Sequence, residues 1–597
     1  MNPSQEKSRQ GLQQAIDAEI KSLEEFVRLL KLRRNALSPI SSLPPEVFAV
    51  IFTFLCAPGT SSPGGKPDHD LARLRISHVC HQWREIALNQ PLLWSHVDFT
   101  TLSLAGAAET LVRAKSVPLY FEASISGHRW DDARFRTFRR ELQSRIPSIR
   151  HLRTRADLVR LSSTLEGLIT PAPTLEYLSL SSRLGHRNRR GERPFLQDTL
   201  FDSSTPRLSC LELSNCNISW KSPLLKGLKY LEILTPSESA RPKLAVWLSA
   251  LDEMPQLKTL TLHSASPVAP PFPFDIRRSV TLPFLTHMDI LASPTDCALA
   301  LAHLDLPALT WLCLTAITSP LPNSGDVQKL LPYVARHAHG PQDSLPLQSV
   351  LIRSENNPAD LLAWPAPNID VEVHNPPTLL AATFPARVAL SFRSNDWLSS
   401  DTRLEILNTV MAGLPLDGLV MLAAHDLGSQ SRHERDLPTR QFWLHLSPKW
   451  PLLQRVRLAP PAARGFIAML LEDNGGRERP VLPSLTALIV VDFSLYALSF
   501  LPLCEALMKR VEQGVPVETL DLRMCLPHPD GRAEDWFRLL SEIVVDVLAP
   551  EKTYEAREQM KSMWKIVARG PFVDDDSFRG HNYSDTGSDD EDEDSSE

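Results

Sequence analysis

Residues 208–218 read LSCLELSNCNI, and the spacing of the apolar residues in this segment decides the predicted fold. Leu208, Leu211 and Leu213 follow an LxxLxL spacing, and Cys216 adds a further apolar position. Leu211 and Leu213 alternate with polar residues, which is typical of a strand that buries one face. The segment therefore predicts one strand of a larger sheet, whose other strands must come from similar segments.

The same spacing recurs along most of the chain. Ten copies begin at Leu175, Leu208, Leu228, Leu257, Leu285, Leu309, Leu347, Leu453, Leu485 and Val517. A proline lies one or two residues ahead of most copies, and the early copies start 20 to 33 residues apart. An LxxLxL core followed by cysteine resembles the leucine-rich repeat, whose period is about 20–29 residues.

We therefore predict an α/β chain in which residues 101–570 form an irregular, leucine-rich-repeat-like solenoid with helices between its strands. Residues 355–445 are poorly patterned, so the array is expected to be interrupted there. The alternative is an unrelated α/β fold whose strands only look alike, and a compact doubly wound sheet would support that alternative.

The polar residues within the repeated strands predict a binding surface. In such a strand the leucines point inward and the residues between them face the concave side. The predicted surface consists of Tyr230, Glu232, Thr261, His263, His287, Asp289, Trp311, Arg353, Arg455, Arg457, Asp521 and Arg523. Its mixture of aromatic and charged residues is typical of protein interfaces, although a single member is more often an ordinary solvated strand position.

A different pattern lies ahead of the repeats. Residues 42–55 read SLPPEVFAVIFTFL, in which the prolines and Glu46 suit the first turn of a helix. Residues 71–87, which end in VCHQWREIA, predict a second helix, and PLLW follows at 91–94. The segment between the two helices is rich in proline and glycine, so it predicts a loop.

Residues 39–98 resemble the F-box motif, with its LPxE helix, its VCxxWR helix and its PxLW end, and the loop at 56–70 is longer than in compact members. The resemblance implies an all-helical F-box domain at 39–100 that binds a Skp-type adaptor and, through it, a cullin scaffold. The predicted adaptor-binding residues are Leu43, Pro44, Pro45, Val47, Phe48, Ile51, Phe52, Leu55, Leu71, Leu74, Val79, Trp83 and Ile86. The alternative is that these side chains only pack against each other and the next domain.

The function that this resemblance implies is a substrate-recognition subunit of a Skp-cullin-F-box (SCF) ubiquitin ligase, which binds a protein cargo through the repeat body. Such a receptor has no catalytic residues and no cofactor or metal site. Two alternatives stay open: an interaction protein that uses its F-box outside ubiquitination, and an enzyme with an undetected site in the body.

The two ends of the chain differ in composition. Residues 1–38 predict an amphipathic helix with a heptad seam at Ile16, Ile20, Leu23, Val27, Leu30 and Leu37. The seam indicates a short coiled coil for self-association or for docking to a partner. The alternative is that it forms an apolar stripe that packs on the neighbouring domain. Residues 571–597 predict a disordered acidic tail, because they are highly charged and poor in apolar residues.

Composition excludes several other classes. Without the eight acids of residues 584–597 the net charge moves from -7 to +1, so nucleic acid is not an expected partner. The eight cysteines form no CxxC pair, and the polar N-terminus is no signal peptide, so we expect a cytoplasmic or nuclear protein with reduced thiols. The apolar stretch Leu485–Cys504 contains Asp492 and Pro502, so a membrane span is not expected there.

Overall fold

The structure is a computed structural model of the chain. It describes residues 3–56, 69–126, 130–183, 192–270, 273, 278–318, 324–341, 344–355, 357–366, 386–394, 400–426, 440–472, 480–494, 497–526 and 533–548. The tail predicted at 571–597 lies outside these residues. The chain forms two compact units, unit 1 (Met1–Leu285 with His303–Leu306) and unit 2 (Thr286–Ala302 with Pro307–Glu597). The region predicted as one repeat body is thus divided between two units.

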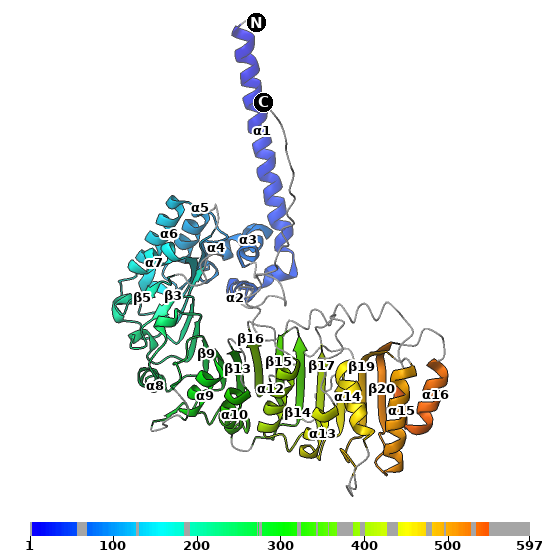
Figure 1. Cartoon of the computed structure of the whole chain (residues 1–597). Coiled ribbons are helices and arrows are strands. Elements are labelled where there is room, and N and C mark those ends of the chain that lie inside the picture. Colours follow the sequence, from blue (N-terminus) through cyan, green and yellow to red (C-terminus); the bar gives the residue numbers. More distant parts are fainter. Residues whose placement is uncertain are drawn as a thin grey trace, which may run out of the picture. The chain divides into compact units, whose positions relative to one another are not determined.

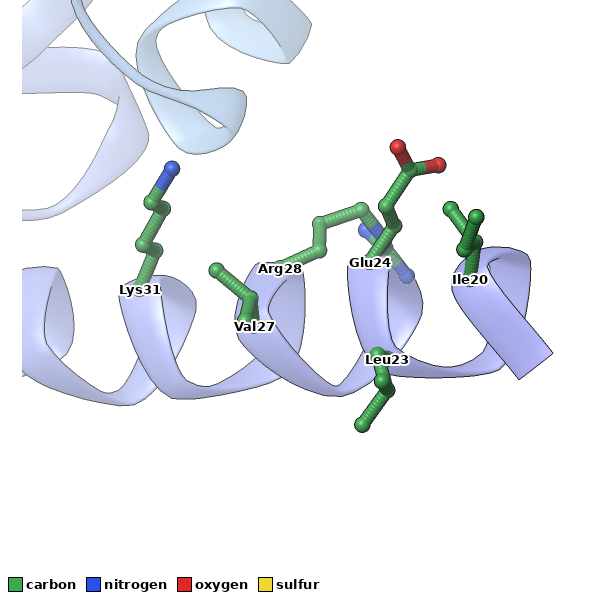
Figure 2. Close-up of a pocket in the computed structure, with 6 residues that line it drawn as sticks. All are labelled: Ile20, Leu23, Glu24, Val27, Arg28 and Lys31. Atoms are coloured by element: carbon green, nitrogen blue, oxygen red, sulfur yellow. The ribbon is translucent and has the colours of Figure 1, made fainter. Parts of the chain in front are cut away.

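Unit 1 begins with helices. These are α1 (Pro3–Ala36), η1 (Pro39–Ser42), α2 (Pro45–Leu55), α3 (His69–Val79), α4 (His81–Leu88) and η2 (Pro91–Trp94). α1 is the predicted N-terminal helix, and all its side chains from residue 11 to residue 31 are exposed. The predicted seam from Ile16 to Leu30 is among them, whereas its last member, Leu37, is exposed just beyond the end of α1. The seam therefore does not pack on another described element of unit 1. Figure 2 shows part of this seam, with Ile20 and Val27 beside the charged Glu24, Arg28 and Lys31.

The rest of unit 1 is built on a parallel sheet. Its strands are β1 (His96–Asp98), β2 (Leu119–Ser124), β3 (Ile149–Asp157), β4 (Tyr177–Arg183), β6 (Cys210–Ser214), β8 (Tyr230–Leu234) and β9 (Thr259–His263). Each strand pairs in parallel with the next one along the chain, without the reversal of order that a doubly wound sheet shows. The order therefore argues against the doubly wound alternative in this unit.

Short helices and turns connect these strands. The helices are α5 (Leu104–Ala114), α6 (Asp132–Arg145), α7 (Leu158–Glu166) and α8 (Leu244–Asp252), with 3-10 turns η3 (Ile146–Ser148), η4 (Leu200–Ser203), η5 (Pro223–Leu225) and η6 (Glu238–Ala240). Two further parallel ribbons pair β5 (Phe195–Leu196) with β7 (Asn217–Ile218), and β10 (Val280–Thr281) with β12 (Leu304–Asp305). A parallel sheet needs such crossover connections because its strands all run in one direction.

The repeated motif has a repeated geometry. Leu178, Leu211, Leu231 and Leu260 lie in register on neighbouring strands and are all buried. Three strands of the motif end in the same turn. Asn215, Thr235 and Ser264, each four residues after the second leucine of its copy, have positive φ angles of 52°, 46° and 56°. Because L residues other than Asn rarely adopt this conformation, its recurrence at one motif position indicates a shared local structure.

Unit 2 is a second α/β sheet. Its strands are β11 (His287–Ala292), β13 (Trp311–Thr318), β14 (Ser349–Glu355), β15 (Asn357–Trp364), β16 (Val388–Ser394), β17 (Met421–Asp426), β18 (Arg455–Leu458), β19 (Ala487–Ser494), β20 (Thr519–Leu526) and β21 (Asp546–Leu548). Its helical elements are α9 (Pro294–Ala302), α10 (Ser324–Ala338), α12 (Ser400–Gly413), α13 (Arg440–Leu446), η7 (Ser447–Lys449), α14 (Pro460–Leu470), α15 (Ala497–Glu512) and α16 (Ala533–Ile543). Figure 1 shows its helices along one face of the sheet.

The poorly patterned region contains the one departure from parallel pairing among the described strand pairs of unit 2. β13 pairs in parallel with β16 rather than with β14, the next strand along the chain. β15 runs antiparallel to both β14 and β16, and β14 then pairs in parallel with β17. The spatial order is therefore β13, β16, β15, β14, β17. The interruption expected at 355–445 takes the form of this inserted hairpin.

All ten copies of the motif end on strands of the two sheets, from β4 to β20. The stretch Leu485–Cys504, which was examined as a membrane span, divides into β19 and the start of α15. Among the described helices, none is both long and apolar enough to span a bilayer.

A buried arginine stabilises the segment ahead of β19. Arg510 on α15 is 1% exposed and donates hydrogen bonds to the carbonyls of Val481, Leu482 and Leu485 at 2.8, 3.0 and 3.3 Å. Leu482 has a φ of 51°, so these bonds hold a residue in an unfavourable conformation. Burial lowers the pKa of Arg510 to about 10, which still leaves it charged at neutral pH.

We predict that Arg510→Leu lowers the free energy of unfolding by about 3 kcal/mol, because three inward-facing carbonyls lose a charged donor. Urea denaturation followed by circular dichroism measures this loss. Arg464→Ala, at an exposed position of α14, serves as the control and is expected to change stability by less than about 0.5 kcal/mol. Equal stability of the two variants would contradict the role given to Arg510.

Candidate protein-interaction surfaces

An aromatic cluster holds the N-terminal helices together. Phe48 and Phe52 of α2 are fully buried, and both rings contact Trp83 of α4, with centroid distances of 5.6 and 5.1 Å. Cys80 caps the N-terminus of α4, because its Sγ accepts a hydrogen bond from the backbone N–H of Trp83. The cysteine and tryptophan of the VCxxWR pattern thus act together: one starts the helix and the other fills the space between α2 and α4.

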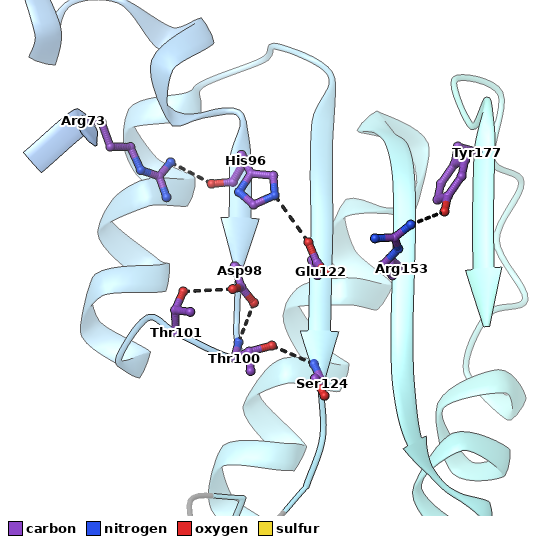
Figure 3. Close-up of polar contacts among 9 residues, drawn as sticks. All are labelled: Arg73, His96, Asp98, Thr100, Thr101, Glu122, Ser124, Arg153 and Tyr177. Atoms are coloured by element: carbon purple, nitrogen blue, oxygen red, sulfur yellow. Dashed lines mark hydrogen bonds and ion pairs between the residues drawn. The ribbon is translucent and has the colours of Figure 1, made fainter. Parts of the chain in front are cut away.

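The helices are joined to the first strand of the sheet. Trp94 is buried and its Nε1 donates to the carbonyl of Ala87 at 2.8 Å, while the Arg113 guanidinium of α5 lies 4.4 Å from its ring centroid. Arg73 of α3 donates to the carbonyl of His96 in β1 at 2.7 Å, as Figure 3 shows. The PxLW end of the motif therefore packs the helices onto the first strand of the sheet.

One face of α2 is not covered by any residue that the structure describes. Val47, Val50, Ile51, Phe54 and Leu55 are between 36% and 69% exposed. Their spacing of three, four, seven and eight residues places them on one side of the helix, next to the side that carries Phe48 and Phe52. Large apolar side chains concentrated on one face of a soluble domain are a mark of an interaction site.

The predicted adaptor-binding residues fall into three groups. Pro44, Pro45, Val47, Ile51, Leu55, Leu74 and Val79 are exposed, and Leu43, Trp83 and Ile86 are half-buried. Phe48 and Phe52 correct the predicted face: they lie in the interior, because a module of three short helices needs aromatic rings to fill its core. The side chain of Leu71 lies outside the described residues.

Two exposed members of this face were missed. Val50 and Phe54 lie between the predicted positions, and Phe54 is the most exposed residue of the face. α2 is apolar on nearly its whole circumference, so its sequence does not show which side is covered. The signal that the sequence did offer is that α2 has more apolar residues than one buried side of so short a helix can hold.

The second candidate surface is the polar face of the sheet in unit 1. Its first row consists of side chains in register across seven strands: His96, Tyr120, His151, Tyr177, Cys210, Tyr230 and Thr259. The His151 ring stacks between Tyr120 and Tyr177, with centroid distances of 4.3 and 5.3 Å. Burial among these rings lowers the pKa of His151, so it is neutral at pH 7.

A charged row lies beside the aromatic row. Its members, also in register, are Asp98, Glu122, Arg153, Ser179, Glu212, Glu232 and Thr261. Arg153 donates to the Tyr177 hydroxyl at 2.6 Å, and that hydroxyl donates to Glu212 (Figure 3 shows the first bond). Burial, followed by the Glu212 hydrogen bond, raises the pKa of Tyr177 to about 12, so it keeps the proton that it donates. The two rows are thus bonded into one ordered surface.

The edge of this surface at β1 is ordered as well. His96 lies 3.6 Å from a carboxylate oxygen of Glu122, and Asp98 accepts hydrogen bonds from Thr100 N–H and from the Thr101 hydroxyl at 2.7 and 2.9 Å. These contacts leave the rings and carboxylates held in place before any partner binds, which lowers the entropy cost of binding.

Four residues of the predicted surface, Tyr230, Glu232, Thr261 and His263, lie on this face at exposed or half-buried positions. The prediction missed its larger part, which is formed by Tyr120, Glu122, His151, Arg153, Tyr177 and Glu212. The strands β2 and β3 carry no LxxLxL copy, although the alternation in residues 119–124 (LYFEAS) indicated a strand with one polar face.

The corresponding face of unit 2 is largely apolar. Cys313, Leu351, Leu362, Trp364, Ala386, Ala389, Met421 and Ala423 form a buried cluster, with Trp311 packed against it. β14 to β17 carry nearly continuous apolar runs, which are typical of strands covered on both faces. The alternation of apolar and polar residues therefore predicted a solvent-exposed surface on these strands, whereas the structure has a second apolar cluster there.

This burial corrects two predicted surface residues. Arg457 is 1% exposed and Asp521 is 5% exposed, and Asp521 accepts a two-pronged contact from Arg523 at 2.7 and 3.1 Å. His287, Asp289, Trp311, Arg455 and Arg523 are half-buried, and the His287 ring lies 5.8 Å from that of Trp311. The side chain of Arg353 lies outside the described residues. The larger polar surface is therefore that of unit 1.

The described side chains offer little reactive chemistry. No group of three or more His, Cys, Asp or Glu among them is arranged to hold a metal ion. Burial raises the pKa of Cys210 and of Cys216 to about 12, so both are protonated thiols at neutral pH and poor nucleophiles.

The comparisons with known proteins bear on the helical domain. The family model for the F-box-like domain matches residues 40–100, which span α2, α3, α4, η2 and β1. A search of curated proteins finds no match to the chain. The cluster of Phe48, Phe52 and Trp83 and the Trp94 contacts thus lie within an F-box-like domain, and this domain supports the assignment of the chain to the F-box protein family.

Proposed function

We propose that this protein is a substrate receptor of an SCF-type ubiquitin ligase, acting in the cytosol or nucleus without a catalytic site of its own. The observation that supports it most strongly is the uncovered apolar face of α2, on a domain whose core is already complete without it. We propose this face, with Leu74 and Val79 of α3, as the contact for a Skp-type adaptor that connects to a cullin.

We propose further that the body is a leucine-rich-repeat array. Two cysteines at the same motif position support this. Cys216 and Cys525, each five residues after the second apolar residue of its copy, donate to the carbonyls of Leu180 and Val490 on the preceding strand, with distances of 3.6 and 3.2 Å. The same contact in both units, together with the repeated positive φ, is what a repeating structural element produces.

The cargo surface that we propose is the pair of aromatic and charged rows in unit 1. Its side chains are held by mutual hydrogen bonds, and Tyr and Arg are the residue types that most often dominate protein interfaces. The exposed end of the aromatic row, Tyr230, is the position best placed to contact a partner.

The first prediction concerns the adaptor. Val47→Asp combined with Ile51→Asp places two charges on the exposed face, and each would lose its hydration on association. Because both side chains are exposed, the fold should survive, which circular dichroism checks. We expect at least a tenfold loss of adaptor and cullin in co-purification, with cargo capture retained.

The matched control is Val112→Asp with Val159→Asp. These valines are 68% and 75% exposed on α5 and α7, away from the proposed face. They add the same two charges and should leave adaptor recovery unchanged. Recovery of the adaptor at the wild-type level by the folded Val47/Ile51 variant would refute the docking face. Recovery of adaptor without cullin from wild type would favour a function outside ubiquitination.

The second prediction concerns the cargo. Proximity labelling with and without proteasome inhibition identifies neighbours whose amounts rise on inhibition. Tyr230→Ala with Glu232→Ala should reduce labelling of those neighbours about tenfold or more and spare the adaptor. Phe195→Ala is the control, because Phe195 is 54% exposed but lies on the separate β5–β7 ribbon. If the two variants reduced the labelling of these neighbours equally, the proposed cargo surface would be wrong.

A further inference from the structure

The helix α1 presents an apolar seam that no described part of unit 1 covers. Ile16, Ile20, Leu23, Val27 and Leu30 are between 46% and 59% exposed. The half-buried positions of the helix among its described side chains, Leu32 and Asn35, lie near its C-terminal end. There the Ser41 hydroxyl donates to the carbonyl of Asn35 at 2.8 Å, which fixes the exit toward α2.

The seam has the composition of a two-stranded coiled coil. In heptad terms Ile20 and Val27 occupy a positions, and Leu23 and Leu30 occupy d positions. β-branched residues at a with leucine at d favour two helices over three or four. A surface groove follows the same stretch, lined by Ile20, Leu23 and Val27 and bordered by Glu24, Arg28 and Lys31 (Figure 2). The seam therefore fits one other helix of similar composition.

Along the part of α1 that carries the seam, residues 16–34, acidic and basic residues are separated into two halves. Residues 16–25 contain Asp17, Glu19, Glu24 and Glu25 against the single Lys21. Residues 26–34 contain Arg28, Lys31, Arg33 and Arg34 and no acid. Such a helix is complementary to a copy of itself only when the two run in opposite directions.

We propose that α1 mediates an antiparallel homodimer of this protein, with its twofold axis near residue 25. In that register Ile20 packs against Leu30 of the partner subunit, and Leu23 packs against Val27 of the partner subunit. The e and g positions then pair Asp17 with Lys31 of the partner subunit and Glu19 with Arg33 of the partner subunit, twice each. Phe26 meets its own copy, and Glu24 facing its own copy is the one like-charge contact.

A parallel dimer on the same seam is electrostatically unfavourable. It would place Arg34 opposite its own copy at an a position, and it would place Glu19 beside Glu24 of the partner subunit on both sides. Like charges at these positions select against a pairing, because e and g residues set the orientation of coiled coils. Charge complementarity thus favours a second copy of α1 as the partner of the seam, and it favours the antiparallel orientation of the two helices.

The dimer would give each assembly two F-box domains and two cargo surfaces. A cargo with two copies of a recognition segment would then bind the second one as an intramolecular event, which raises its overall affinity without new contacts. The two functions assigned to the rest of the chain do not depend on this association.

Charge reversal tests the proposal on the full-length chain by analytical ultracentrifugation. The wild type should sediment as a dimer, and Val27→Asp as a monomer. Lys31→Glu with Arg33→Glu, and separately Asp17→Lys with Glu19→Lys, should each raise the dimer dissociation constant about tenfold or more. Combining all four substitutions should restore it. Lys21→Glu, at an outward b position that does not border the groove, is the control and should keep the wild-type constant.

The second variant distinguishes the two orientations. In a parallel dimer, Glu19→Lys would replace a repulsion with an attraction to Glu24, so tighter association of Asp17→Lys with Glu19→Lys would overturn the antiparallel assignment. A wild-type chain that stays monomeric at every concentration would overturn the dimer itself. Retained adaptor co-purification by the variants shows that a lost dimer is not a lost fold.

Discussion

The register of parallel strands, with one row of apolar side chains buried across them, is the constraint on which the body of this protein depends. Leu178, Leu211, Leu231 and Leu260 occupy that row in unit 1, and a shift of one residue on any strand would expose its leucines. The same register aligns the residues of the opposite face. The alignment of the aromatic and charged rows follows from the burial of the leucines, because successive side chains of a strand point to opposite faces of the sheet.

The same constraint attaches the F-box-like domain to the sheet. Trp94 and Arg73 connect its helices to β1, and β1 pairs in register with β2. The domain therefore contributes the first strand of the sheet and is not joined to it by a linker alone. Its aromatic core fills the space between the small helices, and the outer face of α2 is not covered by the residues that the structure describes.

The two units use their sheets differently. In unit 1 one face is apolar and the other carries polar side chains with mutual hydrogen bonds. In unit 2 both faces around β13 to β17 are apolar, and an antiparallel hairpin is inserted where the motif fails. A strand covered on both sides offers fewer side chains for recognition, so the two halves of a repeated pattern are not equivalent as binding surfaces.

The sequence by itself determined where the strands of the motif begin, that the N-terminal segment is a helix with an apolar seam, and which segment is F-box-like. These conclusions rest on local spacing, since a period of two or of seven residues is written directly in the order of apolar and polar side chains. Only the tertiary structure decided that Phe48 and Phe52 are core while Val50 and Phe54 are exposed, because α2 is apolar nearly all round. It also decided that Arg457 and Asp521 are buried, that β16 pairs with β13, and that Tyr120, His151 and Tyr177 stack in one row. Each of these depends on which distant segments meet, and the pairing of segments is set by the packing of the whole unit rather than by the residues of any one strand or helix.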